Sequence, residues 1–220
     1  MRVFEDMVIL RPREDLEQKW NSATIITPDS ALVSAEQMTG LRHDRACIGE
    51  VVEVGPGSVD CPDMSTVKKG DIVILPLFSC SKVIALKEEV CILVKARALA
   101  GIVTDLGEPC ESVKAINDYV LTRQDREAFE RWMHGGLLLP EQYLADGIPV
   151  DGGTDGMVRL VLERCMSTGG GVYLKKSLWK PKQRKGELLG LNPLASCRFR
   201  RFGQVFRLVP AEDCQFALEE

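Results

Sequence analysis

Cysteine and histidine are the residues of this chain with the most distinctive chemistry. The 220 residues contain eight cysteines, none in a C-x-x-C pair, and the only histidines are His43 and His134. Zinc sites need thiolates and imidazoles at short, regular spacings, and the sequence contains no such spacing. We therefore predict no metal site, and thiols that stay reduced and pack as small apolar side chains.

A catalytic centre is equally hard to assemble from these residues. Ser112 and Ser167 carry no motif that would tie them to His134, and the acidic pair Glu88-Glu89 is typical of a solvated turn. The glycine-rich stretches "DGGTDG" and "STGGGV" do not open a convincing helix after a strand, as a dinucleotide-binding turn must. We predict that the chain is not an enzyme and binds no cofactor.

The segment "HGGLLLPEQ", residues 134–142, is the strongest candidate for binding. Three consecutive leucines match neither the stripe of a helix nor the alternation of a strand. Gly135, Gly136 and Pro140 disfavour a long regular element on either side. Two interpretations remain open: a short buried strand, or an apolar peptide that docks into the groove of a partner.

Composition excludes two classes of partner. The net charge is −4, and the basic run in residues 175–185 lacks stacking aromatics beyond Tyr173 and Trp179, so nucleic-acid binding is not expected. No stretch is long and apolar enough to cross a bilayer, and the opening "MRVFEDMVIL" carries charges within its apolar run, unlike a signal peptide. We expect a soluble, cytoplasmic protein without a membrane partner.

The sequence contains an internal repeat. Shifted by 112 positions, residues 4–30 lie without a gap over residues 116–142, and Trp20 meets Trp132. Two further matches follow in the same order, 69–80 with 185–197 and 90–96 with 205–211. Because the shared order weighs against chance, we predict two domains, 1–104 and 112–220, joined by a linker at 105–111.

Each copy is expected to be mainly β. Short β-branched runs bounded by turn residues predict strands of a small barrel or sandwich, in the first copy at 6–11, 48–55, 71–76, 82–86 and 90–94. Residues 12–20 and 124–132 predict short helical turns, with apolar residues four apart. The Gly- and Asp-rich stretch 143–156 is expected to hold no strand.

In this order the motifs resemble the ten-kilodalton co-chaperonin family, the GroES-like lids of chaperonin chambers. That family has an Asp-x-Val strand, a loop with Gly-Gly and three apolar residues, a G-x-V-x-x-V-G strand and a V-K-x-G-D-x-V segment. The chain carries "EDMVILR", "IGEVVEVGPG", "VKKGDIV" and, in the second copy, "NDYVLTR" and "GGLLLPE". The resemblance implies a mainly β fold of two tandem small β-barrels with long mobile loops, and a roof hairpin within 172–184.

The resemblance also implies a function: capping the chamber of an ATP-driven, GroEL-like chaperonin and assisting protein folding. ATP would be used by the partner and not bound here. The chains would form a ring, heptameric by family default, in a bacterial or infected-host cytoplasm, with a plastid form not excluded. The loop residues that would dock are Gly135, Gly136, Leu137, Leu138, Leu139 and Pro140, with Ile25, Ile26, Thr27 and Pro28 in the first copy.

The first copy departs from the family pattern in its loop. Ala23-Thr24 replace the Gly-Gly pair and Thr27 replaces the third apolar residue, so the second loop is expected to dock more strongly. One alternative is a viral or cellular β-barrel assembly component with the leucines as a subunit clasp. Another is a fragment resembling the catalytic domain of medium-chain dehydrogenases, although Ile48-Gly49-Glu50 lacks the histidine of their Gly-His-Glu.

Overall fold

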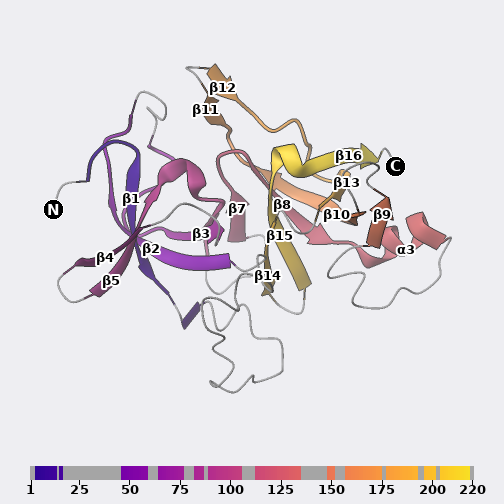
Figure 1. Cartoon of the computed structure of the whole chain (residues 1–220), viewed down its shortest axis with the longest axis horizontal. Coiled ribbons are helices and arrows are strands. Elements are labelled where there is room, and N and C mark those ends of the chain that lie inside the picture. Colours follow the sequence, from indigo (N-terminus) through magenta and orange to yellow (C-terminus); the bar gives the residue numbers. More distant parts are fainter. Residues whose placement is uncertain are drawn as a thin grey trace.

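The computed structural model describes residues 3–13, 15–16, 46–58, 64–76, 82–86, 89–105, 112–134, 148–151, 157–174, 177–192, 196–201 and 204–218. This part of the chain is mainly β, as predicted, and forms two large antiparallel sheets and one small hairpin (Figure 1). The two loop segments expected to bind a partner, 23–28 and 135–140, lie outside the described residues.

The first sheet draws on both halves of the chain. Its strand order is β4-β5-β1-β2-β3-β6-β7, and its last strand, β7, follows the expected linker. Because β7 pairs with β6, the second half contributes an edge strand to the first sheet. The strands are β1 (Met7–Pro12), β2 (Ala46–Val54), β3 (Ile72–Pro76), β4 (Lys82–Leu86), β5 (Glu89–Lys95), β6 (Gly101–Val103) and β7 (Val113–Ala115).

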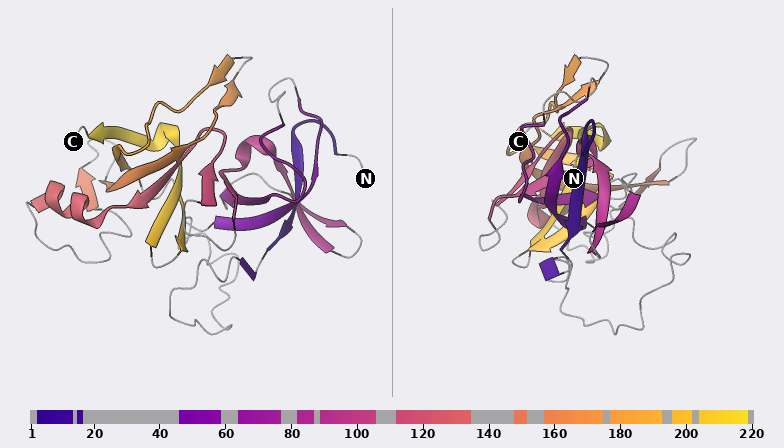
Figure 2. Two further views of the ribbon diagram at one scale, coloured as in Figure 1. Left: turned by 180° about the vertical axis from the view of Figure 1, so that it is seen from behind. Right: turned by 90° about the vertical axis from the view of Figure 1, so that its left-hand side faces the viewer.

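The second sheet has the order β14-β15-β8-β10-β13-β16, with β9 paired to β10. A separate hairpin, β11–β12, projects from this sheet in Figure 1 and in both views of Figure 2, and it lies within the segment predicted for it. The elements are β8 (Tyr119–Gln124), α3 (Arg126–His134), β9 (Ile148–Asp151), β10 (Met157–Thr168), β11 (Val172–Leu174), β12 (Ser177–Trp179), β13 (Leu188–Leu191), β14 (Cys197–Arg201), β15 (Gln204–Pro210) and β16 (Cys214–Leu218).

One expectation about secondary structure is wrong. Strand β9 forms within 143–156, where no strand was expected, and pairs in register with β10 from Leu160↔Ile148 to Met157↔Asp151. The extension of β10 to twelve residues provides the ladder that β9 joins, so a neighbouring strand overrides the weak local preference. The predicted helical segment at 124–132 is confirmed by α3.

The two halves repeat the same irregular backbone features. Glu5 and Asn117, which are 112 positions apart, are the non-glycine residues with positive φ in the described part, at 53° and 54°. The Gly57 N–H donates to the Glu5 oxygen at 3.0 Å, and the Gly171 N–H donates to the Asn117 oxygen at 2.7 Å. Each first strand also shows a register shift at a corresponding place in its ladder. Residues at the same place in the ladders of the two halves are therefore counterparts of one another.

Three of the five apolar clusters in the described residues show how the two sheets meet. One is centred on the first half, around Val8, Leu10 and Val94, and also contains Ile116 of the second half. Its counterpart lies within the second half, around Val120, Leu189 and Val209. A third contains residues of both halves, including Ile48 and Val103 from the first and Leu121 and Leu208 from the second. The two sheets are thus joined through a continuous apolar contact.

Candidate functional site

The two candidate loops leave the described part at comparable places. The first follows Leu16, shortly after β1, and the chain returns at β2. The second follows α3, shortly after β8, and the chain returns at β9. None of the residues predicted to dock is placed by the structure, which describes instead the residues that hold the loop ends.

The first loop begins at a tight turn fixed by backbone hydrogen bonds. The Arg13 N–H donates to the Ile48 oxygen at 2.8 Å, and the Leu16 N–H donates to the Arg13 oxygen at 3.0 Å. The Leu16 side chain is buried in the cluster shared by both halves. This end of the loop is therefore attached to the contact between the halves.

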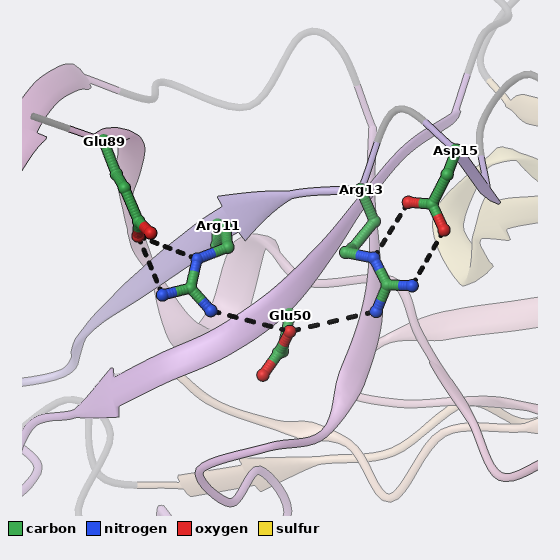
Figure 3. A network of polar contacts seen from close by, with 5 residues as sticks. All are labelled: Arg11, Arg13, Asp15, Glu50 and Glu89. Carbon is green, nitrogen blue, oxygen red and sulfur yellow. Dashed lines mark hydrogen bonds and ion pairs between the residues drawn. The ribbon is translucent and has the colours of Figure 1, made fainter.

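Charged side chains form a row of ion pairs beside the same turn (Figure 3). The Arg13 guanidinium donates to both carboxylate oxygens of Asp15, from Nε at 2.9 Å and from Nη2 at 2.8 Å. Glu50 lies between the two arginines, with its Oε2 at 3.8 Å from Nη1 of both Arg11 and Arg13. Arg11 in turn donates from Nε to Glu89 at 2.9 Å.

These ion pairs are solvent-exposed and each stabilises the fold little. The hydrogen bond from Arg13 lowers the pKa of Asp15, so its carboxylate stays ionised at neutral pH. The row joins β1, β2 and β5 at the point where the first loop leaves the sheet. It can orient that loop and supplies no catalytic group.

The second loop begins at a capped helix. Asp125 is the N-cap of α3, because its Oδ1 accepts the Ala128 N–H at 3.1 Å. Nε of Arg164 donates to Oδ2 of Asp125 at 2.9 Å, and Nη1 of Arg164 donates to the Gly186 oxygen at 2.9 Å. Burial opposes ionisation of Asp125, but the Ala128 N–H and the Arg164 guanidinium outweigh it and lower the pKa of Asp125.

Helix α3 packs one face on the second sheet. Ala128 and Phe129 are buried against Leu162 of β10 and Leu188 of β13. The helix ends at His134, immediately before Gly135 of the predicted docking segment. The second predicted docking segment therefore follows an element that is itself fixed by an N-cap and an apolar face.

The second half contains a buried polar triad that the sequence analysis did not predict. Nε of Arg207 donates to Oε1 of Glu163 at 2.7 Å, and the Thr122 hydroxyl donates to Oε2 of Glu163 at 2.6 Å. All three side chains are buried. Their counterparts in the first half are apolar or lack a side chain: Ile92, Gly49 and Leu10.

The described part offers no other chemistry. Among these residues, no three His, Cys, Asp or Glu side chains gather where they could hold a metal ion. Burial raises the pKa of Cys165 to about 11, so this thiol is protonated and a poor nucleophile at neutral pH. Within the same residues, no helix has the length and apolar character needed to span a membrane.

The geometry is that of a β scaffold which holds the ends of two loops. Residues 1–103 match the model of the family described as Chaperonin 10 Kd subunit. The first half of the chain therefore belongs to this family, the GroES-like co-chaperonins, as the sequence motifs predicted. The match supports a co-chaperonin-like, non-enzymatic role. No curated protein matches the chain.

Proposed function

We propose that the protein is a co-chaperonin that caps the chamber of a GroEL-like chaperonin and docks through its apolar loop tripeptides. The observation that carries this proposal is the family match over residues 1–103. ATP would be bound and hydrolysed by the partner, and the chains would act as a ring, heptameric by family default, in the cytoplasm.

The proposal includes a tandem duplication, with domains at 1–104 and 112–220. Support comes from the recurrence of positive φ at Glu5 and Asn117, and from the shared register shifts of the two first strands. A third correspondence concerns the turn before β3 in the first half and the turn before β13 in the second half. There the Lys68 N–H donates to the Asp71 carboxylate at 2.7 Å, and the Arg184 N–H donates to the Glu187 carboxylate at 2.8 Å.

Docking by short apolar segments suits a lid that must bind and release. Burial of one leucine side chain contributes roughly 1.5–3 kcal/mol, part of which is lost to ordering of the loop. A single loop therefore binds weakly, whereas several loops in one ring bind strongly together. In the second loop Leu137, Leu138 and Leu139 would enter the groove, while the first loop offers Ile25 and Ile26 with Thr27 in third place.

The test is capture by an immobilised GroEL-like chaperonin, with and without ATP. Nucleotide-dependent capture of the full chain is expected. The variant Leu137→Ser/Leu138→Ser should lose at least tenfold in apparent affinity, because it removes two of three apolar contacts from the stronger loop. The matched variant Ile25→Ser/Ile26→Ser should lose less.

Two results would contradict the proposal. One is absence of capture in either nucleotide state. The other is unchanged capture by the leucine variant while the isoleucine variant loses all binding, which would reverse the assigned roles of the loops.

A further inference from the structure

The segment that leaves the β11–β12 hairpin has an alternating surface. From position 178 to position 184, every second side chain is exposed, and each one between is half-buried. Such alternation places the exposed side chains on one side of an extended chain, roughly 6.6 Å apart. These side chains are named the basic strip, which begins on the projecting hairpin (Figure 1) and consists of Leu178, Lys180, Lys182 and Arg184.

The cations of the strip have no anionic partner in the described part of the chain. Lys180, Lys182 and Arg184 form no ion pair there, and their side chains form no hydrogen bond with a described residue. The net charge of the whole chain is −4, so this concentration of positive charge is local. Its field can therefore act on an external partner of opposite charge.

The half-buried side chains attach the strip to the second half. Trp179 packs against the core cluster of that half. Nε2 of Gln183 donates to the Ala211 oxygen at 3.0 Å. Pro181, between them, fixes its own φ and favours an extended conformation for the residue before it. The outward side chains are therefore presented by a backbone that is held on its inner side.

A tight turn fixes the far end of the strip. The Arg184 N–H donates to the Glu187 carboxylate at 2.8 Å, and the Glu187 N–H donates to the Arg184 oxygen at 3.2 Å. The Gly186 N–H donates to the Cys165 oxygen at 2.8 Å and so joins the turn to β10. Because the backbone is ordered before a partner arrives, binding at the strip costs less conformational entropy.

The first half has the same turn without two of these cations. The turns before β3 and β13 share the same hydrogen bond from a backbone N–H to a carboxylate. Counted back from these turns, Lys182 stands at the place of Thr66, and Lys180 at the place of Met64. Met64 packs against the core cluster of the first half, whereas Lys180 is exposed. The fold itself therefore requires no cation at either place.

The second half also lacks an anion that the first half has near this turn. In the first half, Nζ of Lys69 lies 3.7 Å from a carboxylate oxygen of Glu53. Their counterparts, by the turn and by the ladders of the first strands, are Lys185 and Ser167. The second half thus keeps the cation and has a hydroxyl in place of the carboxylate. Positive charge is added at this turn and is not balanced there.

The spacing and charge of the strip define the partner that it fits. Alternate side chains of an extended peptide are also roughly 6.6 Å apart, so acidic residues at every second position match the cations one to one. Clusters of basic side chains recognise acidic peptide motifs in this way. Leu178, which is 45% exposed at one end of the strip, offers a contact for an apolar residue of the same peptide.

Neighbouring carboxylates favour a short acidic segment over a long polyanion. Glu212 and Asp213 directly follow Ala211, the residue to which Gln183 is bonded. A nucleic-acid strand that continued past the strip would be repelled by these carboxylates. The strip also has no aromatic residue among its exposed side chains on which bases could stack. A protein segment with its acidic residues in one short stretch avoids both problems.

We propose that the basic strip binds a short, extended protein segment in which acidic residues occupy every second position and an apolar residue lies at one end. The cations pair with the carboxylates, and Leu178 packs against the apolar residue. This surface is separate from the two predicted docking segments. The proposal does not depend on chaperonin capping, and its test needs no chaperonin.

The test is fluorescence anisotropy of the full chain with a labelled peptide in which glutamate and threonine alternate between two terminal leucines. The symmetric pattern lets the peptide align in either direction. Binding is expected at low salt and should weaken at least about fivefold at high salt, because exposed ion pairs are screened. The same peptide with glutamine in place of glutamate should not bind measurably.

Two lysine variants of equal charge show where the peptide binds. Lys180→Met/Lys182→Thr installs the first-half residues and should weaken binding at least about fivefold, because two ion pairs are lost. Lys82→Thr/Lys95→Met removes the same charge from exposed positions of β4 and β5 and should bind like the wild type. Both variants should keep the unfolding transition of the wild type, because all four lysines are exposed.

Three results would overturn the proposal. One is a peptide that does not bind the wild type even at low salt. Another is an equal loss of affinity in the two lysine variants, which would show a response to net charge alone. The third is tighter binding of a single-stranded DNA oligonucleotide of matched charge than of the peptide, which would assign the strip to nucleic acid.

Discussion

At the scale of single residues, the buried pair of Arg207 and Glu163 is the feature that most distinguishes the second half from the first. Burial of two charges costs several kcal/mol per ion, and the attraction between them returns this only while both partners and the Thr122 bond are present. At the corresponding places the first half uses Leu10, Gly49 and Ile92, which carry no charge. The pair is therefore not required by the fold itself.

Loss of one member of the triad should therefore lower the free energy of unfolding more than replacement of all three. Arg207→Leu leaves the Glu163 carboxylate buried without its cation and should lower the free energy of unfolding by about 3–5 kcal/mol. The triple variant Thr122→Leu/Glu163→Gly/Arg207→Ile installs the first-half residues and should recover most of that loss. Urea denaturation of both variants measures this, and a triple variant no more stable than Arg207→Leu would contradict it.

At the scale of elements, helix α3 depends on its N-cap and on its buried face. Asp125 satisfies the first-turn N–H of Ala128 and accepts a bond from Arg164, so it connects the helix to β10. The second docking segment follows this helix directly, and loss of the cap would loosen the attachment of that segment.

The cap also predicts a dependence on pH. Asp125→Ala should lower the free energy of unfolding at pH 7 by about 1 kcal/mol, a typical value for an N-cap. The pKa of Asp125 is lowered in the folded state, so its contribution is complete above the unfolded pKa of about 3.9 and is lost as the pH falls through the folded pKa. The difference between wild type and variant should therefore shrink in acid.

Thermal unfolding at pH 7 and below pH 3 measures this difference. Glu127→Ala is the matched control, since Glu127 lies in the same first turn but is exposed. A stability difference for Asp125→Ala that did not change with pH would show that the carboxylate charge plays no part.

The sequence predicted the elements whose signals are local. The run at 82–86 became β4, and the apolar residues four apart at 124–132 indicated α3. Strand β9 was missed because Pro149 and the surrounding Gly and Asp residues weaken its local signal, while its stability comes from pairing with β10. Family membership was recognisable from short motifs, and the family match confirms it for the first half.

The features that were missed depend on contacts between distant residues. Glu163 sits between Leu162 and Arg164 and looks like an ordinary solvent-facing residue, because its partner lies 44 positions away. The contact between the two halves was missed because β7 lies beyond the expected linker and yet completes the first sheet. The docking segments predicted at 23–28 and 135–140 lie outside the described residues and remain predictions.

At the scale of the whole molecule, the apolar contact between the two halves makes them interdependent. Ile116 of the second half packs in the core cluster of the first, and Leu208 lies so close to β6 that a Cβ at Gly101 would meet its Cδ1 at 2.9 Å. With such shared contacts the halves should unfold together.

Shortening a side chain in this contact should weaken the coupling between the halves. Leu208→Ala should lower the free energy of unfolding by about 2–5 kcal/mol, because Leu208 is fully buried, and should broaden or split the single unfolding transition. Circular dichroism during urea denaturation measures both effects. Leu178→Ala serves as the control, since Leu178 is 45% exposed. Equal, small losses for the two variants would show that the halves are independent.

Ile74 of β3 lies opposite Gly101 of β6, whereas at the corresponding places in the second half Gly190 of β13 lies opposite Phe216 of β16. This exchange of large and small residues predicts how related sequences should vary. Each pair holds one large and one small residue across neighbouring strands, in opposite order. Drift at either position is tolerated only with a compensating change opposite it. Sequences descended from the same ancestor should therefore show covariation in size at 74 with 101, and at 190 with 216, even where neither position keeps its identity.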